Sequence, residues 1–396
     1  MLYLDNASTT PVDPEVIQAM VDELQHFGNP SSKYYPEATS AASRLKNYRQ
    51  TVSTLFGTYP NNIIFNGGAT EGNNHVILSC FYTHPEKKHF ITTNAEHKSV
   101  LETLKFLETL GAEVTYLPVS EKCTVTAQQV SNAIKEDTNL VSIFFANNEV
   151  GSLNDVEAIG KVCKDHKVLF HTDGTQAVGK IPINLSKIPV DFFTFSGHKI
   201  FGPKGVGALY IGNNEYGIRH KLIPLLHGGD QEFKLRSGTQ SMHNIAGLAK
   251  ACELVPKHIE LYNSQVKEIE KEFVQELINA FGDKVKFFGD QEHKVPGLIS
   301  FALEGLNNEM FLANYCNEVS LSTGSACAIN EPSHVLKAMG YIDYAKSVLR
   351  LSFSPYSTSI HLLPQILKDY LLFLWEQCAL PSSFVGPHAT HAHGGF

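Results

Sequence analysis

Short apolar runs and helical patterns alternate along the first two thirds of the chain. Seven runs have the length and the β-branched or aromatic content of strands, and they lie at 62–68, 89–94, 113–118, 140–147, 168–173, 191–196 and 207–212. Segments with helical spacing of apolar residues lie between some of them, at 99–111 and 155–166. Nearly continuous apolar strands that alternate with helices are typical of a mostly parallel sheet covered on both faces. The pattern predicts an α/β fold whose larger part holds a mostly parallel sheet of seven strands.

The pattern changes after about residue 255. A long helical stretch at 257–281 is followed by apolar runs at 297–303 and 348–353 and by a last helical stretch at 364–378. This order is typical of a smaller α+β domain, and a chain of 396 residues exceeds the size at which one hydrophobic core keeps growing. We therefore predict a large domain at 16–255, a small domain made of 1–15 and 256–380, and a flexible tail at 381–396.

Composition and charge narrow the class of protein. Apolar residues make up 43% of the chain, which is enough for a sizeable core. The formal net charge of -8 argues against a nucleic-acid-binding surface and against binding to an anionic membrane, because both attract Lys and Arg. The start of the chain, MLYLDNASTT, lacks the pattern of a signal peptide, and no apolar run approaches the ~20 residues of a membrane span. We expect a soluble cytoplasmic protein that binds neither nucleic acid nor membrane.

Cysteine usage argues against two further classes. The seven cysteines are odd in number and form no CxxC pair, which disfavours a disulfide framework and a structural zinc site. Near the C-terminus, His388, His391 and His393 are more typical of a frayed tail than of a metal site, so no metal is expected. Cys327 differs from the other cysteines because it lies among small and polar residues, in LSTGSACAINEPS at 321–333. Such surroundings are more typical of a thiol that must move than of a buried structural cysteine.

The residues that follow the predicted strands carry the candidate chemistry, because ligands of parallel α/β sheets bind beyond the carboxyl ends of the strands. In DFFTFSGHKIFGPKG, Ser196, Gly197, His198 and Lys199 follow a strand in a glycine-rich turn. A partly desolvated lysine at the sheet edge is suited to forming an imine with a carbonyl compound. A surface lysine explains the same spacing equally well, and Lys204 is a second lysine in the same loop.

Asp173 ends the preceding predicted strand, in HTDGTQ. A carboxylate there and a lysine at the end of the next strand form the pair that a pyridoxal phosphate site requires. The lysine forms the imine, and the acid keeps the pyridine nitrogen protonated. An aspartate at a strand end is also common as a turn or helix-cap residue.

Three further strand ends carry polar groups. Gly67 and Gly68 precede Ala69 and Thr70 at the start of a predicted helix, where free N–H groups and a hydroxyl can bind a phosphate. Ordinary N-capping explains the same residues. The strand at 89–94 is followed by Glu96 and His97, and the strand at 140–147 ends on Asn147 and is followed by Asn148 and Glu149. A histidine in that position can stack on a cofactor ring or fill a turn. Five strand ends that each carry a suitable group are far less expected by chance than a single one.

Ten short motifs follow one another from residue 2 to about residue 355: YLDNASTTPVDP, FGNPSS, NGGATEGNN, AEHKSV, NNEVG, HTDGTQAVGK, FSGHKIFGPKGVGALY, HGG, RSGTQ and TGSAC. In this order they closely resemble the motifs of the cysteine desulfurases of the NifS/IscS type. The resemblance implies the fold-type I architecture of PLP-dependent transferases. It also implies a homodimer with active sites at the subunit boundary.

The resemblance further implies roles for individual residues. Lys199 would be the imine lysine, Asp173 would face the pyridinium nitrogen of pyridoxal 5'-phosphate, and Gln176 would face its ring hydroxyl. His97 would stack on the ring and help to move protons, and Cys327 would be the catalytic cysteine. The substrate carboxylate would be held by Arg350, while Asn148 would contact cofactor and substrate. The cofactor phosphate would be bound by Ala69, Thr70, Ser196, His198 and, from the other subunit, Thr239.

The implied reaction converts L-cysteine to L-alanine and leaves sulfane sulfur on Cys327 as a persulfide. An acceptor protein of iron–sulfur cluster assembly, tRNA thiolation or DNA phosphorothioation would then receive the sulfur. Two alternatives stay open at this point: a selenocysteine lyase of the same fold, and a catalytically inactive scaffold homologue. A scaffold would have no need to keep Lys199, Asp173, His97, Arg350 and Cys327.

Two departures from the family pattern stand out. Gly174 replaces the alanine that usually follows the aspartate. Three residues separate Cys327 from Glu331, about two fewer than in the housekeeping members of the family. The shorter loop suggests an acceptor that comes close to the active site, so we do not assume the usual iron–sulfur scaffold as partner.

Overall fold

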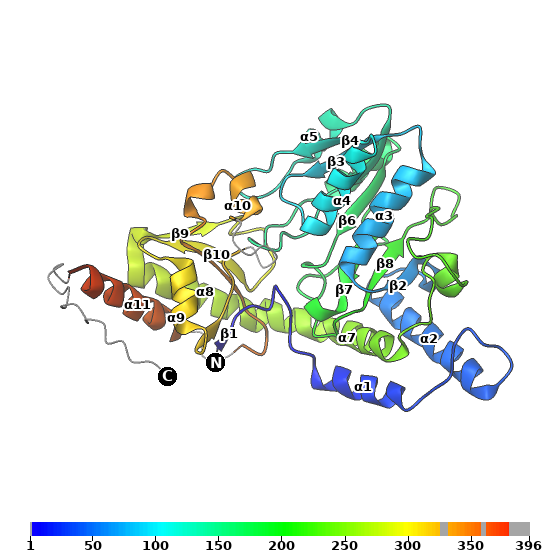
Figure 1. Cartoon of the computed structure of the whole chain (residues 1–396), viewed down its shortest axis with the longest axis horizontal. Coiled ribbons are helices and arrows are strands. Elements are labelled where there is room, and N and C mark those ends of the chain that lie inside the picture. Colours follow the sequence, from blue (N-terminus) through cyan, green and yellow to red (C-terminus); the bar gives the residue numbers. More distant parts are fainter. Residues whose placement is uncertain (1, 325–331, 358–361, 380–396) are drawn as a thin grey trace, which may run out of the picture.

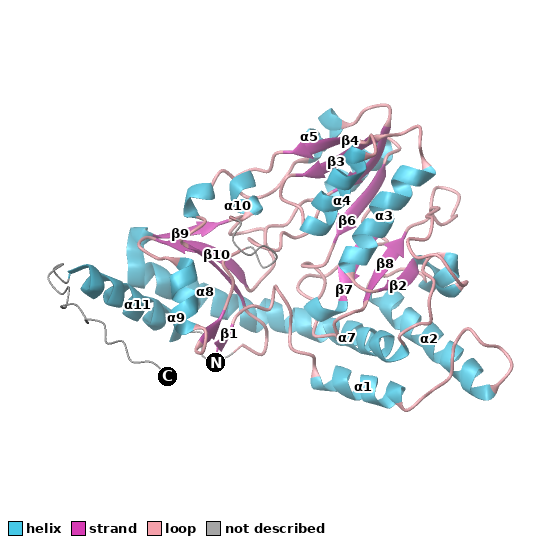
Figure 2. Cartoon of the chain, in the orientation of Figure 1, coloured by secondary structure: helices cyan, strands magenta, loops and turns pink. Residues whose placement is uncertain are grey.

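The central feature of the fold is a seven-stranded sheet with the order β2-β8-β7-β6-β5-β3-β4 (Figure 2). The computed structural model describes residues 2–324, 332–357 and 362–379. The strands are β2 (Ile63–Asn66), β3 (His89–Thr93), β4 (Glu113–Leu117), β5 (Thr138–Ser142), β6 (Leu169–Asp173), β7 (Phe192–Ser196) and β8 (Gly207–Ile211). β4, β3, β5, β6 and β7 pair in parallel, whereas β8 is antiparallel to both of its neighbours. The predicted mostly parallel sheet of seven strands is confirmed.

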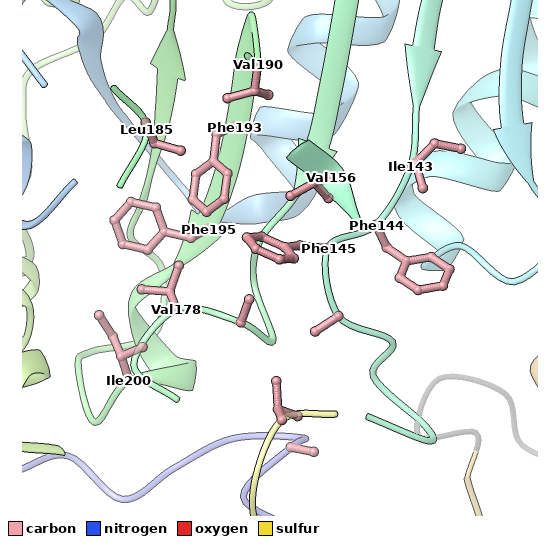
Figure 3. Close-up of a cluster of buried hydrophobic side chains, with 14 of the residues drawn as sticks. Ile143, Phe144, Phe145, Val156, Val178, Leu185, Val190, Phe193, Phe195 and Ile200 are labelled. Atoms are coloured by element: carbon pink, nitrogen blue, oxygen red, sulfur yellow. The ribbon is translucent and has the colours of Figure 1, made fainter. Parts of the chain in front are cut away.

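Outside β4, the strands are buried at nearly every position because both faces of the sheet are covered. In β2, Ile63 and Phe65 belong to a core on one face, and Ile64 belongs to a core on the other. In β7, Phe193 belongs to the first of these cores and Phe192 belongs to the second. Side chains of a strand alternate between its faces, so a strand covered on both sides buries its side chains in two different cores. Figure 3 shows part of the first core, with Phe193 among its labelled side chains.

Helices cover the two faces of the sheet (Figure 1). The first core includes side chains from α1 (Pro14–Leu24), α2 (Pro36–Leu55), α5 (Ala127–Ala133), α6 (Val156–Asp165) and α7 (Met242–Leu261). The second of these cores includes side chains from α3 (Ala69–Thr83) and α4 (Lys98–Thr109). α4 and α6 confirm the helices predicted at 99–111 and 155–166. α6 begins where the Asp155 side chain accepts a hydrogen bond from Ala158 N (2.9 Å), an N-cap that satisfies a helix-start N–H group.

A smaller group of strands and helices follows the large sheet along the chain. β9 (Val285–Phe288), β10 (Leu298–Leu303) and β12 (Val348–Ser352) form an antiparallel sheet with the order β12-β10-β9. β1 (Leu2–Tyr3) pairs in parallel with β11 (Val319–Ser320). The helices of this part are α8 (Lys267–Phe281), α9 (Asn308–Tyr315), α10 (His334–Ala338) and α11 (Leu362–Ala379). The strands predicted at 297–303 and 348–353 are confirmed as β10 and β12, whereas β9 was not predicted.

The division into two domains near residue 255 stays a prediction. α7 continues through this position to Leu261, and a π-helical segment, Tyr262–Val266, joins it to α8. The helix predicted at 257–281 is therefore the second part of a longer helical run that begins at Met242. We propose the division because a core distinct from the first two gathers Leu4, Phe201 and apolar residues from Tyr262 to Tyr370. The predicted tail at 381–396 lies outside the described residues.

The N-terminal segment connects the two sheets. Ser352 N, on β12, donates a hydrogen bond to Leu4 O (2.7 Å). At the other end of the segment, Thr10 N donates to His198 O (2.9 Å), and Phe201 N donates to the Thr10 hydroxyl oxygen (2.8 Å). Residues 5–9 therefore cross from the small sheet to the carboxyl end of β7.

No helix among the described residues is long and apolar enough to cross a membrane.

Phe193 explains the glycine that follows Asp173. A Cβ atom built on Gly174 would lie 2.0 Å from Cζ of Phe193, far inside van der Waals contact. Phe193 has no exposed surface and belongs to the first core, so its ring cannot move outward into solvent. The aromatic ring thus occupies the space that an alanine side chain would need.

We expect Gly174→Ala to lower the free energy of unfolding by about 1–3 kcal/mol, because it overpacks a well-filled core. Urea unfolding of both proteins measures this difference. Gly229→Ala is a matched control, because the atoms nearest to a Cβ there belong to the end of the Gln231 side chain. Equal losses in the two variants would contradict the role given to Phe193.

Candidate active site

A pocket of about 550 Å³ lies at the carboxyl ends of β6 and β7. Ten of the residues predicted from the sequence line it: Ala69, Thr70, His97, Asn148, Asp173, Gln176, Ser196, His198, Lys199 and Arg350. Thr239 is exposed and does not line this pocket, and Cys327 lies outside the described residues. A larger depression, of about 870 Å³, lies beside α2 and contains none of the predicted residues. The structure thus brings ten predicted residues into one pocket, while their roles stay predictions.

Lys199 is placed by the short 3₁₀ helix Gly197–Lys199 that follows β7. Its Nζ donates hydrogen bonds to the carbonyl oxygens of Ala7 (2.5 Å) and Ser8 (2.6 Å). The N-terminal segment therefore supplies acceptors for the amine inside the pocket. Lys204 lines the same pocket but is exposed.

Asp173, at the end of β6, uses both carboxylate oxygens as acceptors. Oδ1 accepts from Thr175 N (2.9 Å), and Oδ2 accepts from Asn73 Nδ2 (2.7 Å). The neighbouring Gln176 is also fixed, because its Nε2 donates to Ala7 O (2.8 Å). Two anchored polar side chains thus face the pocket from the end of one strand.

His97 is the N-cap residue of α4, and its Nδ1 accepts from Ser99 N (3.1 Å). Burial lowers the pKa of His97, Asp173 acts in the opposite direction, and Lys199 and the adjacent Lys98 lower it further. The ring is therefore neutral at pH 7. A neutral imidazole can lie against an aromatic ring and still exchange protons.

The loop before α3 forms a cradle. Gly68 has φ +136°, and a Cβ atom there would lie 3.2 Å from the Ser196 hydroxyl oxygen. No side chain among the described residues caps the N-terminus of α3, which begins at Ala69. The N–H groups of both glycines are already used, since Gly67 N donates to Glu71 (2.7 Å) and Gly68 N donates to Asn66 (3.0 Å). The predicted donors of the glycine pair are thus engaged, and an anion would have to use the first residues of the helix.

His198 contributes no charge to this cradle. Burial and the neighbouring Lys199 and Lys204 lower the pKa of His198 to about 4. Its Nδ1 lies 3.2 Å from the Thr9 hydroxyl oxygen.

Arg350 extends from β12 and is 1% exposed. Its Nη2 donates to Asp5 Oδ1 (2.8 Å) and to the Ser8 hydroxyl oxygen (2.6 Å), and its Nη1 donates to Asn148 O (3.0 Å). Its buried Nε has no hydrogen-bond partner among the described residues. A planar guanidinium with a donor to spare suits a carboxylate ligand.

On either side of residues 325–331, a described residue contacts a residue that lines the pocket. On one side, Arg350 Nη1 lies 3.5 Å from Gly324 O. On the other side, the Ser333 hydroxyl donates to Glu149 Oε2 (2.5 Å), and Glu149 lines the pocket.

The donor set fits pyridoxal phosphate. Thr175 lines the pocket, and its hydroxyl oxygen is buried without a hydrogen-bond partner among the described residues, so it can bond a polar group of a ligand. The uncapped start of α3 suits the phosphate, and Asp173 suits a protonated ring nitrogen. The residues that hold Asp173, His97 and Gln176 in place, namely Asn73, Ser99, Lys180 and Ala7, were not predicted from the sequence. All four stand in motifs quoted above, which were the available signal: NGGATEGNN holds Asn73, AEHKSV holds Ser99, HTDGTQAVGK holds Lys180 and YLDNASTTPVDP holds Ala7.

Comparison with known proteins gives consistent results. Residues 2–362 match the family described as Aminotransferase class-V. The chain is 40% identical over 363 residues to the cysteine desulfurase of Pongo abelii, which covers 90% of this chain and 78% of that protein. A solved NifS-like protein is 33% identical, with a TM-score of 0.85 over 95% of this chain and 99% of that one. SspA in complex with cysteine is 35% identical, with a TM-score of 0.78 over 90% of this chain and 100% of that one.

Lys180 makes the stability of the protein depend on pH. Its Nζ is buried and donates to Gln176 O (3.1 Å) and to Gln176 Oε1 (3.2 Å). Burial, together with the charge of Lys199, lowers the pKa of Lys180 from 10.5 to about 7. Between these two pH values the unfolded chain holds more protons than the folded one, so the free energy of unfolding rises with pH.

We expect the stability difference between the natural protein and Lys180→Met to shift in favour of the natural protein by about 2 kcal/mol from pH 7 to pH 9. Urea unfolding at both pH values measures it. Lys271→Met, which removes an exposed lysine on α8, is the control. A difference that does not change with pH for Lys180→Met would show that the folded protein does not release this proton.

Proposed function

The chain belongs to the aminotransferase class-V family and, within it, to the PLP-dependent cysteine desulfurases, and we propose on this basis that it converts L-cysteine to L-alanine and leaves the sulfur as a persulfide on Cys327. One observation carries the proposal. Lys199, Asp173, His97 and Arg350 come from four separate parts of the sequence and line one pocket.

In this proposal the pocket holds pyridoxal phosphate. When bound, the cofactor supplies an electron sink that makes loss of the substrate Cα proton feasible. Lys199 would hold the cofactor through Nζ and carry the substrate proton at the same atom. Asp173 would accept the N–H of the ring nitrogen, Gln176 would face the ring hydroxyl, and His97 would lie against the ring. Ala7 O and Ser8 O accept hydrogen bonds from Lys199 Nζ. They would hold the lysine amine in this position when the substrate amine, rather than Lys199, is joined to the cofactor.

The phosphate would lie at the start of α3. Ala69, Thr70, Ser196 and His198 surround this end of the pocket. Because burial lowers the pKa of His198, this residue would act as a neutral hydrogen-bond partner rather than as a cation.

Arg350 would bind the carboxylate of L-cysteine, with Asn148 beside it. The guanidinium keeps contacts with Asp5, Ser8 and Asn148 O, so the substrate would share it with the N-terminal segment. The buried Nε, which has no partner among the described residues, is the donor that the carboxylate would satisfy.

Cys327 would receive the sulfur. It stands three residues after Gly324, and three residues span at most about 10 Å. Because Gly324 O lies beside Arg350, the thiol is within reach of a substrate bound there. The Cys327 thiolate would attack the substrate sulfur, the C–S bond would break as the S–S bond forms, and the carbon product would be protonated to give alanine. One L-cysteine and one thiol thus give one L-alanine and one persulfide, so atoms and electrons balance.

The persulfide would pass to an acceptor protein. Iron–sulfur cluster assembly, tRNA thiolation and DNA phosphorothioation are the processes that we propose for this acceptor. Since the segment that carries Cys327 is short, the acceptor would approach the pocket itself.

Cys327→Ser tests the reaction. We expect the variant to remain yellow with bound cofactor and to form alanine from L-cysteine at the background rate, because binding and sulfur acceptance use different residues. Cys316→Ser, which removes an exposed thiol at the end of α9, is the matched control and should behave like the natural protein. Alanine formation by Cys327→Ser at the natural rate would contradict the assignment. The same assay with selenocysteine distinguishes a selenocysteine lyase.

We further propose a homodimer formed through the α1 side of the molecule. Ile17, Val21 and Leu24 lie one helical turn apart on α1 and are exposed. In the following loop, Phe27 is 86% exposed and Tyr34 is 97% exposed. A second copy would cover this apolar surface. Thr239, which is exposed in a single chain, would then complete the phosphate site of the partner.

Leu24→Asp tests the dimer. We expect it to raise the dissociation constant at least about tenfold in analytical ultracentrifugation, because a buried leucine contributes about 1.5–3 kcal/mol. Cofactor affinity should fall in parallel, since each site would lose Thr239 of the partner. Leu110→Asp, at an exposed leucine that ends α4, is the control. A monomeric natural protein, or an unchanged dissociation constant in Leu24→Asp, would refute this interface.

A further inference from the structure

Asn73 lies at the centre of a buried hydrogen-bond network beneath the pocket. It is on α3, has no exposed surface, and is not one of the residues that line the pocket. Its Nδ2 donates to Asp173 Oδ2 (2.7 Å) and to the Ser99 hydroxyl oxygen (2.9 Å). Its Oδ1 accepts from the Thr194 hydroxyl (2.5 Å). All the hydrogen-bonding groups of this amide are therefore used.

The orientation of the Asn73 amide follows from its partners. If the amide were rotated by 180°, Oδ1 would face Asp173 Oδ2, and two acceptors would be in contact. Asp173 Oδ2 requires a donor, so Nδ2 must face it. Thr194 then has to donate to Oδ1, because its hydroxyl is the partner that carries a hydrogen. Asp173 thus fixes the direction of each hydrogen bond in the network.

The hydrogen-bond network continues from Asn73 through Ser99 to His97. Ser99 N–H points at His97 Nδ1 (3.1 Å), and a backbone N–H can only donate. The Ser99 hydroxyl oxygen accepts from Asn73, so its own hydrogen is available for His97 Nδ1, which lies 2.8 Å away. Nδ1 thus faces one fixed donor, the Ser99 N–H, and one available donor, the Ser99 hydroxyl. A proton on Nδ1 would collide with the fixed N–H, so the proton of the neutral ring must be on Nε2.

The charged and titratable groups around His97 favour the neutral ring. Lys98 is on α4, Lys199 follows β7, and His334 begins α10, while Asp173 ends β6. Burial and the first three groups lower the pKa of His97, and Asp173 alone among these four raises it. Asp173 is itself bonded to Asn73, so part of its attraction is directed to the amide.

We propose that Asn73 is a positioning residue that, through Ser99, holds His97 as the neutral ring with its proton on Nε2, and that fixes Asp173 with its second N–H. The role of this arrangement in catalysis rests on the proposed function, whereas the hydrogen-bond network itself does not depend on it. With Nε2 protonated, His97 can give a proton or a hydrogen bond to a ligand but cannot accept one there. Acceptance of the substrate proton is then left to Lys199, and His97 acts as a donor.

Two variants test the network in the full-length protein, with and without pyridoxal phosphate. Ser99→Ala removes one of the two donors to Nδ1 and, with it, the acceptor of one Asn73 N–H. Asn73→Asp keeps the shape of the side chain but replaces the amide by a carboxyl group. Side-chain ¹⁵N chemical shifts of labelled histidine, assigned with His97→Gln, report the tautomer and the titration of His97 directly.

In the natural protein we expect Nε2 to carry the proton and Nδ1 to be an acceptor. The titration of His97 should move to higher pH by about half a unit in Ser99→Ala, because a bond to the neutral form is lost. In Asn73→Asp the carboxyl group keeps a proton because it lies against the Asp173 carboxylate. The donor to Ser99 is then lost without any added charge, and the titration of His97 should move in the same direction as in Ser99→Ala. The acid limb of the pH profile for alanine formation should move with it.

Two buried residues elsewhere provide matched controls. Ser79→Ala removes a hydroxyl on α3 that accepts from Ile223 N (2.7 Å). Asn139→Asp removes an amide that donates to Cys80 O (3.0 Å) and Lys87 O (2.8 Å). Both remove hydrogen bonds of a buried side chain, as the test variants do, and neither should move the titration of His97.

The outcomes separate this proposal from the proposed function. A proton on Nδ1 in the natural protein, or an unchanged titration in both test variants, would overturn the network. A titration that moves equally in the controls would overturn it as well. If His97 behaves as expected but the natural protein forms no alanine from L-cysteine, the network stands and the desulfurase activity fails.

Discussion

The N-terminal segment 5–9 is the constraint on which the pocket depends. It joins β12 to the residues after β7, and it meets both cations that the proposed chemistry uses. Arg350 donates to Asp5 and Ser8, and Lys199 donates to the carbonyl oxygens of Ala7 and Ser8. An arginine and a lysine from different sheets would otherwise repel each other across a buried pocket. The segment places hydrogen-bond acceptors against both side chains.

Burial decides which groups of the site carry charge. It lowers the pKa of His198 and of the more deeply buried His171 to about 4, and it lowers the pKa of His97. These three histidines are therefore neutral at pH 7 and add no positive charge to the site. A pocket whose imidazoles are neutral can hold an aromatic ring against them without desolvating further cations. Its few cations then match the few negative charges of a phosphate and a carboxylate.

The sequence predicts the parts of this site that local pattern controls. Apart from the edge strand β4, the strands of the large sheet are buried on both faces, so each apolar run is visible without knowledge of its neighbours, and the residue after the run must lie at the sheet edge. Lys199, Asp173 and His97 could be found in this way. The contacts that hold them could not, because they join residues far apart: Asp5 meets Arg350 across 345 positions, and Asn73 meets Asp173 across 100. On α3, nothing in the letters around Asn73 distinguishes an asparagine that faces Asp173 from one that faces solvent.

α3 positions residues at both ends of the site. Its uncapped start, at Ala69 and Thr70, lines the pocket where a phosphate would bind, and Asn73 follows Thr70 by three residues on the same side of the helix. Asn73 holds Asp173, which would face the ring nitrogen at the far end of the cofactor. A helix is stiff over one turn, so the separation between the phosphate position and the carboxylate is fixed by the helix rather than by loops. The pocket can therefore be formed to the length of its cofactor before the cofactor binds, and the entropy of ordering the two ends is lost on folding and not on binding.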